Sequence, residues 1–551
     1  MHLNELILAA MVLLAVFTPR LGDRAFSLVE SLGAALARRK RFVLLAVPFV
    51  AISARLALLP LFPAPILEFP DEFSYLLSAD TFAHGRLANP PHAMWVFFET
   101  FHVLQHPTYA SKFFPAQGSV LALGQMLGHP WIGVLLSMAA MTTAVTWMLQ
   151  GWFPAPWALL GTVLVLVRFD LFNYWINCYW GGAIAATGGA LVLGAFRRLL
   201  HRPRWRDSFL LGIGAALLAN SRPYEGFLFC LPVAVALAIW LFRQEISVLK
   251  TTAPPVLIPA ASVLLLTVLF MGYYNSQVTG SALLMPEALY TRQYEQTGLF
   301  AWQAPDLSLT YQNPQFRELY STGASKWYRR SWRDWIHRSW HSCKEWWTFF
   351  LGGTLSFPFI TLPWLLRDRR MRLFFVQFFC VVVGILAIVY FFPHYAAPLT
   401  AVVFALVVQA MRHLRQWKVG DRPVGVALTR VVMLSVLANV PYYAWTQARQ
   451  PPAAESWNAG RARIVRQLDA TPGHHLVIVR YREDHWPSNE WVYNGADIEG
   501  AKIVWAREIP GRDLQPLFDY FRDRRVWLLN ADVLPAVLEP YTSPPPRSSN
   551  P

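Results

Sequence analysis

Apolar residues occur along this chain in long blocks that short polar or basic segments separate. Three of the blocks, 42–62, 255–273 and 373–391, are close to the roughly 20 helical residues that cross a hydrocarbon layer about 30 Å thick. Arg55 is the only charged residue in these three blocks. The same length criterion predicts about twelve transmembrane helices, near 4–18, 42–62, 131–150, 155–169, 172–196, 208–220, 224–242, 254–274, 347–366, 373–391, 395–411 and 425–446. The fold class expected from this pattern is a polytopic α-helical membrane protein.

Short basic clusters adjoin several of the apolar blocks. They lie at 38–41, 197–206, 367–372 and 412–422. The positive-inside rule places such clusters in cytoplasmic loops. With the first cluster inside, the segments 63–130 and 275–346 and the tail after Pro451 all fall on the external side. The block 117–127 is too short to span, so we expect a half-helix or re-entrant segment there, of the kind that lines a protein cavity.

Composition supports a membrane protein and argues against nucleic-acid binding. Hydrophobic residues make up 55% of the 551 residues and charged residues only 15%, as in membrane proteins. The net charge of +15 comes from the basic clusters, because the chain from Pro451 onward holds 12 Lys and Arg against 13 Asp and Glu. The four cysteines show neither CxxC spacing nor an obvious pairing, so we expect no disulfide framework and no zinc site.

Changes in composition divide the chain into four parts. We predict an N-terminal anchor helix and a cytoplasmic amphipathic segment in 1–41, and a transmembrane catalytic domain in 42–450. After Pro451 the composition becomes that of a soluble protein, and we predict a small α/β domain of 451–540 on the external side, followed by a disordered tail, 541–551. The predicted strands and helix of this domain are 475–481, 502–507, 525–529 and 512–522.

The segment 275–346 ends in an aromatic-rich stretch. Its large side chains recur at mostly helical spacing, with Arg and Lys between them. They are Trp332, Trp335, Ile336, Trp340, Cys343, Trp346 and Trp347. The pattern predicts an amphipathic helix at the membrane interface.

Two adjacent carboxylates, Asp71 and Glu72, follow the second apolar block at the predicted start of a helix. The helix dipole favours carboxylates there, so capping is one interpretation. The other is a functional role, in which these carboxylates share one cavity with a basic residue from farther along the chain. The two are not expected to form the carboxylate pair of a glycoside hydrolase, because adjacent helical residues point about 100° apart.

A lysine lies farther along the same predicted external segment. In Ser111-Lys112-Phe-Phe-Pro115-Ala-Gln-Gly118 it directly precedes the predicted half-helix, so we expect Lys112 on the same membrane face as the carboxylates. Lys112 is a candidate partner for an anionic phosphate; the alternative is an interfacial, snorkelling lysine. The histidines of this segment match no common metal-ligand spacing. They are His84, His92, His102 and His106.

Polar and aromatic residues also gather at 168–182, between two apolar blocks. Asp170 is a charge at membrane depth, which is costly without a function. Asn177 lies among aromatic residues of the kind that pack against a sugar ring. The alternative is an interfacial aromatic belt, in which glycines such as Gly188 and Gly189 serve close helix packing.

The order of these motifs resembles the GT-C superfamily of membrane glycosyltransferases, specifically the group of the bacterial protein O-mannosyltransferases and the lipid A aminoarabinose transferases. The elements that carry the resemblance are Pro70-Asp71-Glu72 with Tyr75, His106-Pro107, Lys112-x-x-Pro115-x-x-Gly118, Asn220-Ser-Arg222-Pro223-Tyr-Glu225-Gly226 and His394-Tyr395-Ala-Ala-Pro398. They span roughly residues 42–412. In two departures, Phe114-Pro115 stands where the family has a proline pair, and His394 stands where arginine is frequent.

The resemblance implies an inverting transfer of a sugar from a polyprenyl phosphate to an acceptor hydroxyl. Asp71 would take the acceptor proton, and the cations Lys112 and Arg222, with His394, would stabilise the departing phosphate. The substrate-binding residues expected on this basis are Glu72, Tyr75, Lys112, Asp170, Asn177, Arg222, His394 and Tyr395.

The resemblance also implies the partners and the location. The donor would be a polyprenyl-phosphate sugar and the acceptor a lipid, a glycan or a protein; no cofactor is certain, and Mg²⁺ or Mn²⁺ stays an open possibility. The chain would be a multi-pass protein of the inner cell membrane with its site facing the periplasm or exterior. The alternatives are a transporter or flippase of lipid-linked saccharides, which duplicated halves would favour although no convincing repeat is present, and a membrane glycan polymerase or ligase.

Overall fold

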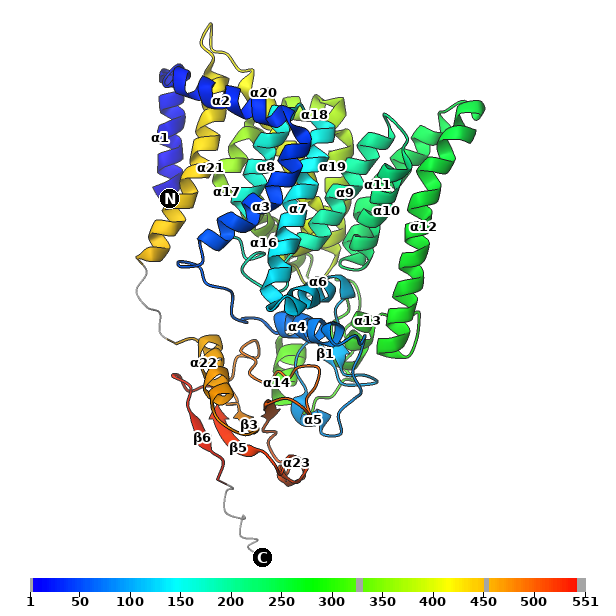
Figure 1. Ribbon diagram of the computed structural model, residues 1–551, viewed down its shortest axis with the longest axis vertical. Coiled ribbons are helices and arrows are strands. Elements are labelled where there is room, and N and C mark those ends of the chain that lie inside the picture. Colours follow the sequence, from blue (N-terminus) through cyan, green and yellow to red (C-terminus); the bar gives the residue numbers. More distant parts are fainter. Residues whose placement is uncertain (1–2, 324–330, 450–454, 543–551) are drawn as a thin grey trace, which may run out of the picture.

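The computed structural model describes residues 3–323, 331–449 and 455–542. The predicted disordered tail lies outside these residues except for its first two. A bundle of helices forms most of the molecule, and a small sheet with its own helices lies beyond one end of the bundle (Figure 1).

Helices lie in or near every segment in which a crossing was predicted. They are α1 (Leu3–Phe17), α3 (Lys40–Ala57), α7 (Pro130–Trp152), α8 (Ala155–Phe169), α9 (Ala183–Leu199), α10 (Trp205–Ala219), α11 (Pro223–Phe242), α12 (Ile246–Thr279), α19 (Arg372–Ala387), α20 (Thr400–Arg415) and α21 (Val424–Ala448), with 332–367 described below. Among the described residues, six helices are long and apolar enough to cross a membrane, and a bent pair at 332–367 gives up to seven. Others are shorter, such as α8 and α10 with 15 residues each. The chain therefore has the helices of a multi-pass membrane protein, and twelve crossings stays a prediction.

Helix α20 forms the centre of the bundle. The apolar part of the segment Pro393–Arg415, which contains α20, is 94% buried. Helix α20 packs against α8, α9 and α21. Small residues allow close approach nearby: a Cβ built on Gly188 would lie 2.7 Å from the carbonyl oxygen of Gly214 in α10. This is the packing that small residues permit between membrane helices.

The two ends of the bundle differ in what covers them. Helices α2 (Asp23–Arg38) and α18 (Leu362–Arg367) lie at the end that carries the basic clusters, whereas α4 (Pro70–Ala83), α6 (Pro115–Met126) and α13 (Pro286–Tyr294) lie at the opposite end, beside the sheet (Figure 1). Helix α6 has only 12 residues and packs against α4 and α7. It is the short helix predicted at 117–127.

Proline begins each of four helices that meet at this second end. The prolines are Pro70, Pro115, Pro223 and Pro286, at the starts of α4, α6, α11 and α13. Proline suits the first helical turn because its missing N–H would have no intrahelical partner there. Residues beside these prolines, among them Asp71 and Arg222, are thereby fixed at helix N-termini.

The aromatic stretch at the end of 275–346 is helical, as its spacing predicts. Helix α16 (Trp332–Phe350) exposes Trp332 and Trp340 and buries Trp346. The chain then bends by 96° into the segment Gly352–Arg367, which includes α17 (Gly352–Ser356) and ends in α18. This amphipathic helix is therefore half of a bent pair.

The C-terminal domain is a four-stranded sheet with two helices. The strands lie in the order β4 (Ile503–Arg507), β3 (His475–Arg480), β5 (Arg525–Asn530) and β6 (Leu538–Pro540). β3 is parallel to β4 and β5, and β6 is antiparallel to β5. Three strands match the predicted ones, and helix α23 (Gln515–Tyr520) falls within the predicted helix; helix α22 (Trp457–Ala470) and β6 have no predicted counterpart.

The C-terminal domain packs directly onto the back of α4. Leu77 of α4 shares an apolar cluster with Leu476 and Val504 of the sheet, and Asp80 accepts a hydrogen bond from the backbone N–H of Ala496 at 2.7 Å. The domain thus supports the helix that carries Asp71 and Glu72.

Candidate active site

Glu72 closes the start of α4 and uses both of its carboxylate oxygens to do so. Oε2 accepts hydrogen bonds from the backbone N–H groups of Glu68 (2.7 Å) and Phe69 (3.0 Å), and Oε1 accepts one from Tyr179 (2.9 Å). The side chain is buried, with 1% of its surface exposed. The capping interpretation therefore describes the contacts of Glu72, and it also ties α4 to the 168–182 segment.

Asp71 points into a cluster of charged and aromatic side chains. Its Oδ2 lies 3.6 Å from Nε2 of His102, and Lys112 and Arg222 interact with it electrostatically. Burial raises the pKa of the Asp71 carboxyl to about 6, because desolvation outweighs the two cations. Among the described residues no side chain donates a hydrogen bond to Asp71. It is a carboxylate with a pKa close to neutrality and with free acceptor capacity.

Lys112 reaches the same cluster from the end of the short strand β2 (Ala110–Ser111). Its backbone N–H donates to the carbonyl oxygen of His102 at 3.1 Å. Its Nζ lies 2.7 Å from Oε1 of Glu295 and 4.8 Å from the centre of the Tyr290 ring. The Lys112 ammonium is thus paired with Glu295, and an incoming anion would have to compete with that carboxylate.

Arg222 lies at the N-cap of α11, where the chain breaks between α10 and α11. Its guanidinium stacks on the ring of Tyr395, 4.1 Å from the ring centre. Within the described part of the chain the guanidinium has neither a hydrogen bond nor an ion pair, so its donors are available to an anion. The start of α6 is joined to this break by a hydrogen bond from Ala116 N–H to the carbonyl oxygen of Asn220 at 3.1 Å.

His394 packs against Tyr395, the residue on which the Arg222 guanidinium stacks. His394 is buried, and its Nδ1 lies 3.0 Å from the hydroxyl of Tyr174. Its ring also packs against Trp180, with 4.7 Å between ring centres. The surroundings of His394 are therefore aromatic, and the charged residue that interacts with it electrostatically is Arg222.

Tyr75 forms one wall of the cluster, one helical turn after Asp71. Its ring stacks on Phe113 with 4.4 Å between centres and 13° between planes. Burial raises the pKa of its hydroxyl above the usual value. Tyr75 is therefore neutral and positioned beside Asp71 and Arg222, with which it interacts electrostatically.

The structure does not bring Asp170 and Asn177 to this cluster. Asp170 is fully buried at the end of α8 and accepts a hydrogen bond from the hydroxyl of Thr142 at 2.6 Å. Asn177 accepts one at 2.7 Å from Arg55, a buried arginine that also holds the chain after α3. These contacts fix the 168–182 segment inside the bundle.

Three ionisable residues of the cluster carried no functional prediction from the sequence: His102, Glu287 and Glu295. His102 has a pKa well below its usual value, because burial and the nearby Lys112 disfavour the imidazolium. Burial raises the pKa of Glu287, at the start of α13, against the effect of Lys112 and Arg222. The cluster thus contains two cations, Lys112 and Arg222, and three carboxylates, Asp71, Glu287 and Glu295. Among the described residues, no group of three or more His, Cys, Asp or Glu side chains has the arrangement of a metal site.

Comparisons with known proteins give only distant structural similarity. The chain matches no protein-family model and no curated protein. Among solved structures, it is similar to the Archaeoglobus fulgidus oligosaccharyltransferase tethered to an acceptor peptide with the NVT sequon (TM-score 0.46, 11% identity, 82% of this chain and 62% of that chain). It is also similar to ArnT from Cupriavidus metallidurans bound to undecaprenyl phosphate (TM-score 0.45, 13% identity, 89% of this chain and 92% of that chain). The chain spans less than two thirds of the length of the archaeal enzyme.

Proposed function

We propose that this chain is an inverting, integral-membrane glycosyltransferase that moves a sugar from a polyprenyl-phosphate donor to an acceptor hydroxyl. The observation that carries the proposal is Asp71, a carboxylate with free acceptor capacity and a pKa of about 6 that interacts electrostatically with the cations Lys112 and Arg222. A general base works best when its pKa lies near the working pH. Cations beside it suit a leaving group that departs as a phosphate.

In the proposed reaction the acceptor oxygen attacks the anomeric carbon from the face opposite the phosphate. The bond from that carbon to the phosphate oxygen breaks, its electron pair leaves with the polyprenyl phosphate, and the acceptor proton passes to Asp71. The phosphate would meet the unpaired guanidinium of Arg222 and compete with Glu295 for Lys112. His394 and Tyr395 would position the guanidinium. No proton is needed by a leaving group that already carries negative charge.

The proposed setting is the external face of the inner membrane. The cluster lies at the end of the bundle opposite the basic clusters (Figure 1), and the positive-inside rule assigns those clusters to the cytoplasm. A polyprenyl-phosphate donor suits an external site, where nucleotide sugars are not expected.

A transport assay and a transfer assay separate this proposal from the flippase alternative. Protein in lipid vesicles would be given a polyprenyl-phosphate sugar radiolabelled in the sugar, with a membrane lipid and glycan extract as the source of acceptor. A transferase releases unglycosylated polyprenyl phosphate and moves the label to an acceptor. A flippase moves intact donor across the bilayer and leaves its anomeric bond unbroken, which would overturn the proposal.

A further inference from the structure

A cavity of about 530 Å³ lies at the end of the bundle opposite the Asp71 cluster. It is formed by the last turns of α7 and α9 and by the turn into α10. Its lining includes Trp147, Arg197, Arg198, Arg202, Arg204 and Asp207. Four arginines therefore surround a hollow that contains a single carboxylate.

The back of this cavity is built around Arg198. Its guanidinium stacks on Trp147 at 3.8 Å from the ring centre and donates to the carbonyl oxygens of Gly194 and Trp147, both at 2.8 Å. Gly151 leaves the space for it, because a Cβ there would lie 2.8 Å from Nη1 of Arg198. Arg198 is thus held in place by the protein, and Arg197, Arg202 and Arg204 complete the basic lining of the cavity.

The protein neutralises the positive charge of the cavity only in part, because Asp207 is the one carboxylate in its lining and interacts electrostatically with Arg198 and Arg204. Within the described residues, none of the four arginines has a carboxylate oxygen within 4.0 Å. Other arginines at the same end are paired, since Arg415 and Arg430 lie 2.7 and 3.0 Å from the oxygens of Glu30. The cavity therefore suits an anion that comes from outside the chain.

An apolar groove begins at the same tryptophan. It runs between α3, α7, α9 and α10, with Trp147 shared between groove and cavity. Its lining includes Leu44, Pro48, Ile52, Ala140, Leu191 and Leu210, and it carries no charged side chain. Cavity and groove therefore adjoin at Trp147, and this two-part hollow has a basic end and an apolar end.

We propose that this hollow binds an anionic phospholipid, with the phosphate of its headgroup among Arg197, Arg202 and Arg204 and an acyl chain in the groove. The surplus of positive charge favours an anionic headgroup over a zwitterionic one, as basic pockets between membrane helices do. The groove favours a lipid over free phosphate. The site is separate from the Asp71 cluster and does not depend on the proposed function.

Native mass spectrometry of the delipidated full chain tests the headgroup and the lipid character. Phosphatidylglycerol should bind about tenfold more tightly than phosphatidylcholine of the same acyl chains, and millimolar inorganic phosphate should not displace it. Equal affinity for the two lipids would overturn the proposal. Displacement by phosphate alone would show a site for the free anion and would also overturn it.

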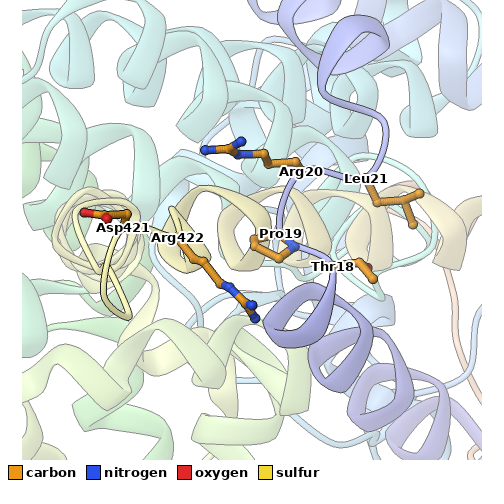
Figure 2. A pocket seen from close by; sticks show the side chains of 6 residues that line it. All are labelled: Thr18, Pro19, Arg20, Leu21, Asp421 and Arg422. Atoms are coloured by element: carbon orange, nitrogen blue, oxygen red, sulfur yellow. The ribbon is translucent and has the colours of Figure 1, made fainter.

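Paired variants test the position of the site. The change R202Q/R204Q should remove most of the preference for phosphatidylglycerol. Its control, R20Q/R422Q, removes two exposed arginines from another pocket at the same end, which Asp421 also lines (Figure 2). That control should keep the preference; loss of preference to the same extent in both would show a general charge effect and contradict the proposal.

The groove has its own matched pair of variants. Ala140→Trp fills the exposed floor of the groove on α7 and should weaken binding of both lipids without changing the preference between them. Ala261→Trp places the same bulk on the exposed face of α12 and should leave binding unchanged. Binding that is unaffected by Ala140→Trp would overturn the role of the groove.

Discussion

His102 is held beside Asp71, with 3.6 Å between its Nε2 and Oδ2 of the carboxylate. Its backbone is in the left-handed region, with φ 64°, which residues other than glycine seldom adopt. The carbonyl oxygen of His102 accepts hydrogen bonds from the hydroxyl of Ser74 at 2.6 Å and the N–H of Lys112 at 3.1 Å, and its own N–H donates to the hydroxyl of Tyr290 at 2.8 Å. The backbone of one strained residue therefore connects the helix of Asp71, the lysine and α13.

Substitutions at His102 should separate backbone strain from the imidazole. His102→Ala should be less stable than His102→Gly by about 1 kcal/mol, because only glycine adopts this φ without a Cβ penalty. Thermal unfolding of both variants in the same detergent measures the difference. An alanine variant as stable as the glycine variant would show that the left-handed conformation is absent in solution.

Transfer activity should rise with pH through the pKa of Asp71. The base accepts a proton only when ionised, so the rate at saturating donor should increase around pH 6 and level off above it. Glu295→Gln should move the midpoint down, because Glu295 raises the pKa of Asp71, and Lys112→Gln should move it up, because Lys112 lowers it. Shifts of the same sign in both variants would contradict the arrangement of charges in the cluster.

Protein stability should fall as pH rises through the pKa of Asp71, whereas transfer activity should rise. A carboxyl group with a raised pKa binds protons more tightly in the folded state, so it costs stability as pH rises from about 4 to about 6. Asp71→Asn should therefore be more stable than the parent chain at pH 8, by at most roughly 3 kcal/mol for a shift of about two units, and the gain should shrink toward pH 4. Melting curves at the two pH values measure it; a loss of stability at pH 8 would contradict the desolvation of Asp71.

Binding of the leaving group should depend on Lys112 and not on lysines elsewhere. Lys112→Gln should weaken binding of polyprenyl phosphate by about tenfold or more, as expected for loss of a charge-assisted contact. Lys250→Gln removes an exposed lysine at the opposite end of the bundle and should have no effect. Equal affinities of the two variants would remove Lys112 from the proposed phosphate site.

The stability of the C-terminal domain should depend on the buried ion pair between Arg507 and Glu490. Nη2 of Arg507 lies 2.5 Å from Oε2 of Glu490, and both side chains are almost fully buried. Arg507→Met leaves a buried carboxylate without its partner, which costs about 3–5 kcal/mol, whereas R507M/E490Q should recover much of that loss. Limited proteolysis of residues 455–542 follows the effect; a double variant as labile as the single one would contradict this assignment.

The positions of Asp71 and Arg222 in the site could be predicted from the residues next to them in the sequence. Pro70 and Pro223 begin helices, so the positions of Asp71 and Arg222 at helix N-termini follow from neighbouring residues. The apolar blocks likewise predicted the positions of the helices. Three strands of the C-terminal sheet followed from runs of β-branched and aromatic residues.

The rest of the site depends on contacts between distant segments. Glu295 meets Lys112 across 183 residues of sequence, and nothing in the neighbourhood of either residue indicates the pair. Asp170 was singled out because a charge at membrane depth is costly, and Asn177 because it lies among aromatic residues that suit a sugar ring. The sequence does not reveal that Thr142 and Arg55 satisfy these two side chains. Short helices such as α8 also leave the number of crossings open, since 15 residues fall below the spanning length.

The most direct test of the central claim is the rate of sugar transfer by Asp71→Asn at saturating donor. Loss of the general base should lower the rate by about 10²–10⁴-fold while polyprenyl phosphate still binds, and Asp523→Asn, an exposed change in the C-terminal domain, should leave the rate unchanged. A rate in Asp71→Asn equal to that of the parent chain would contradict the claim that Asp71 is the catalytic base.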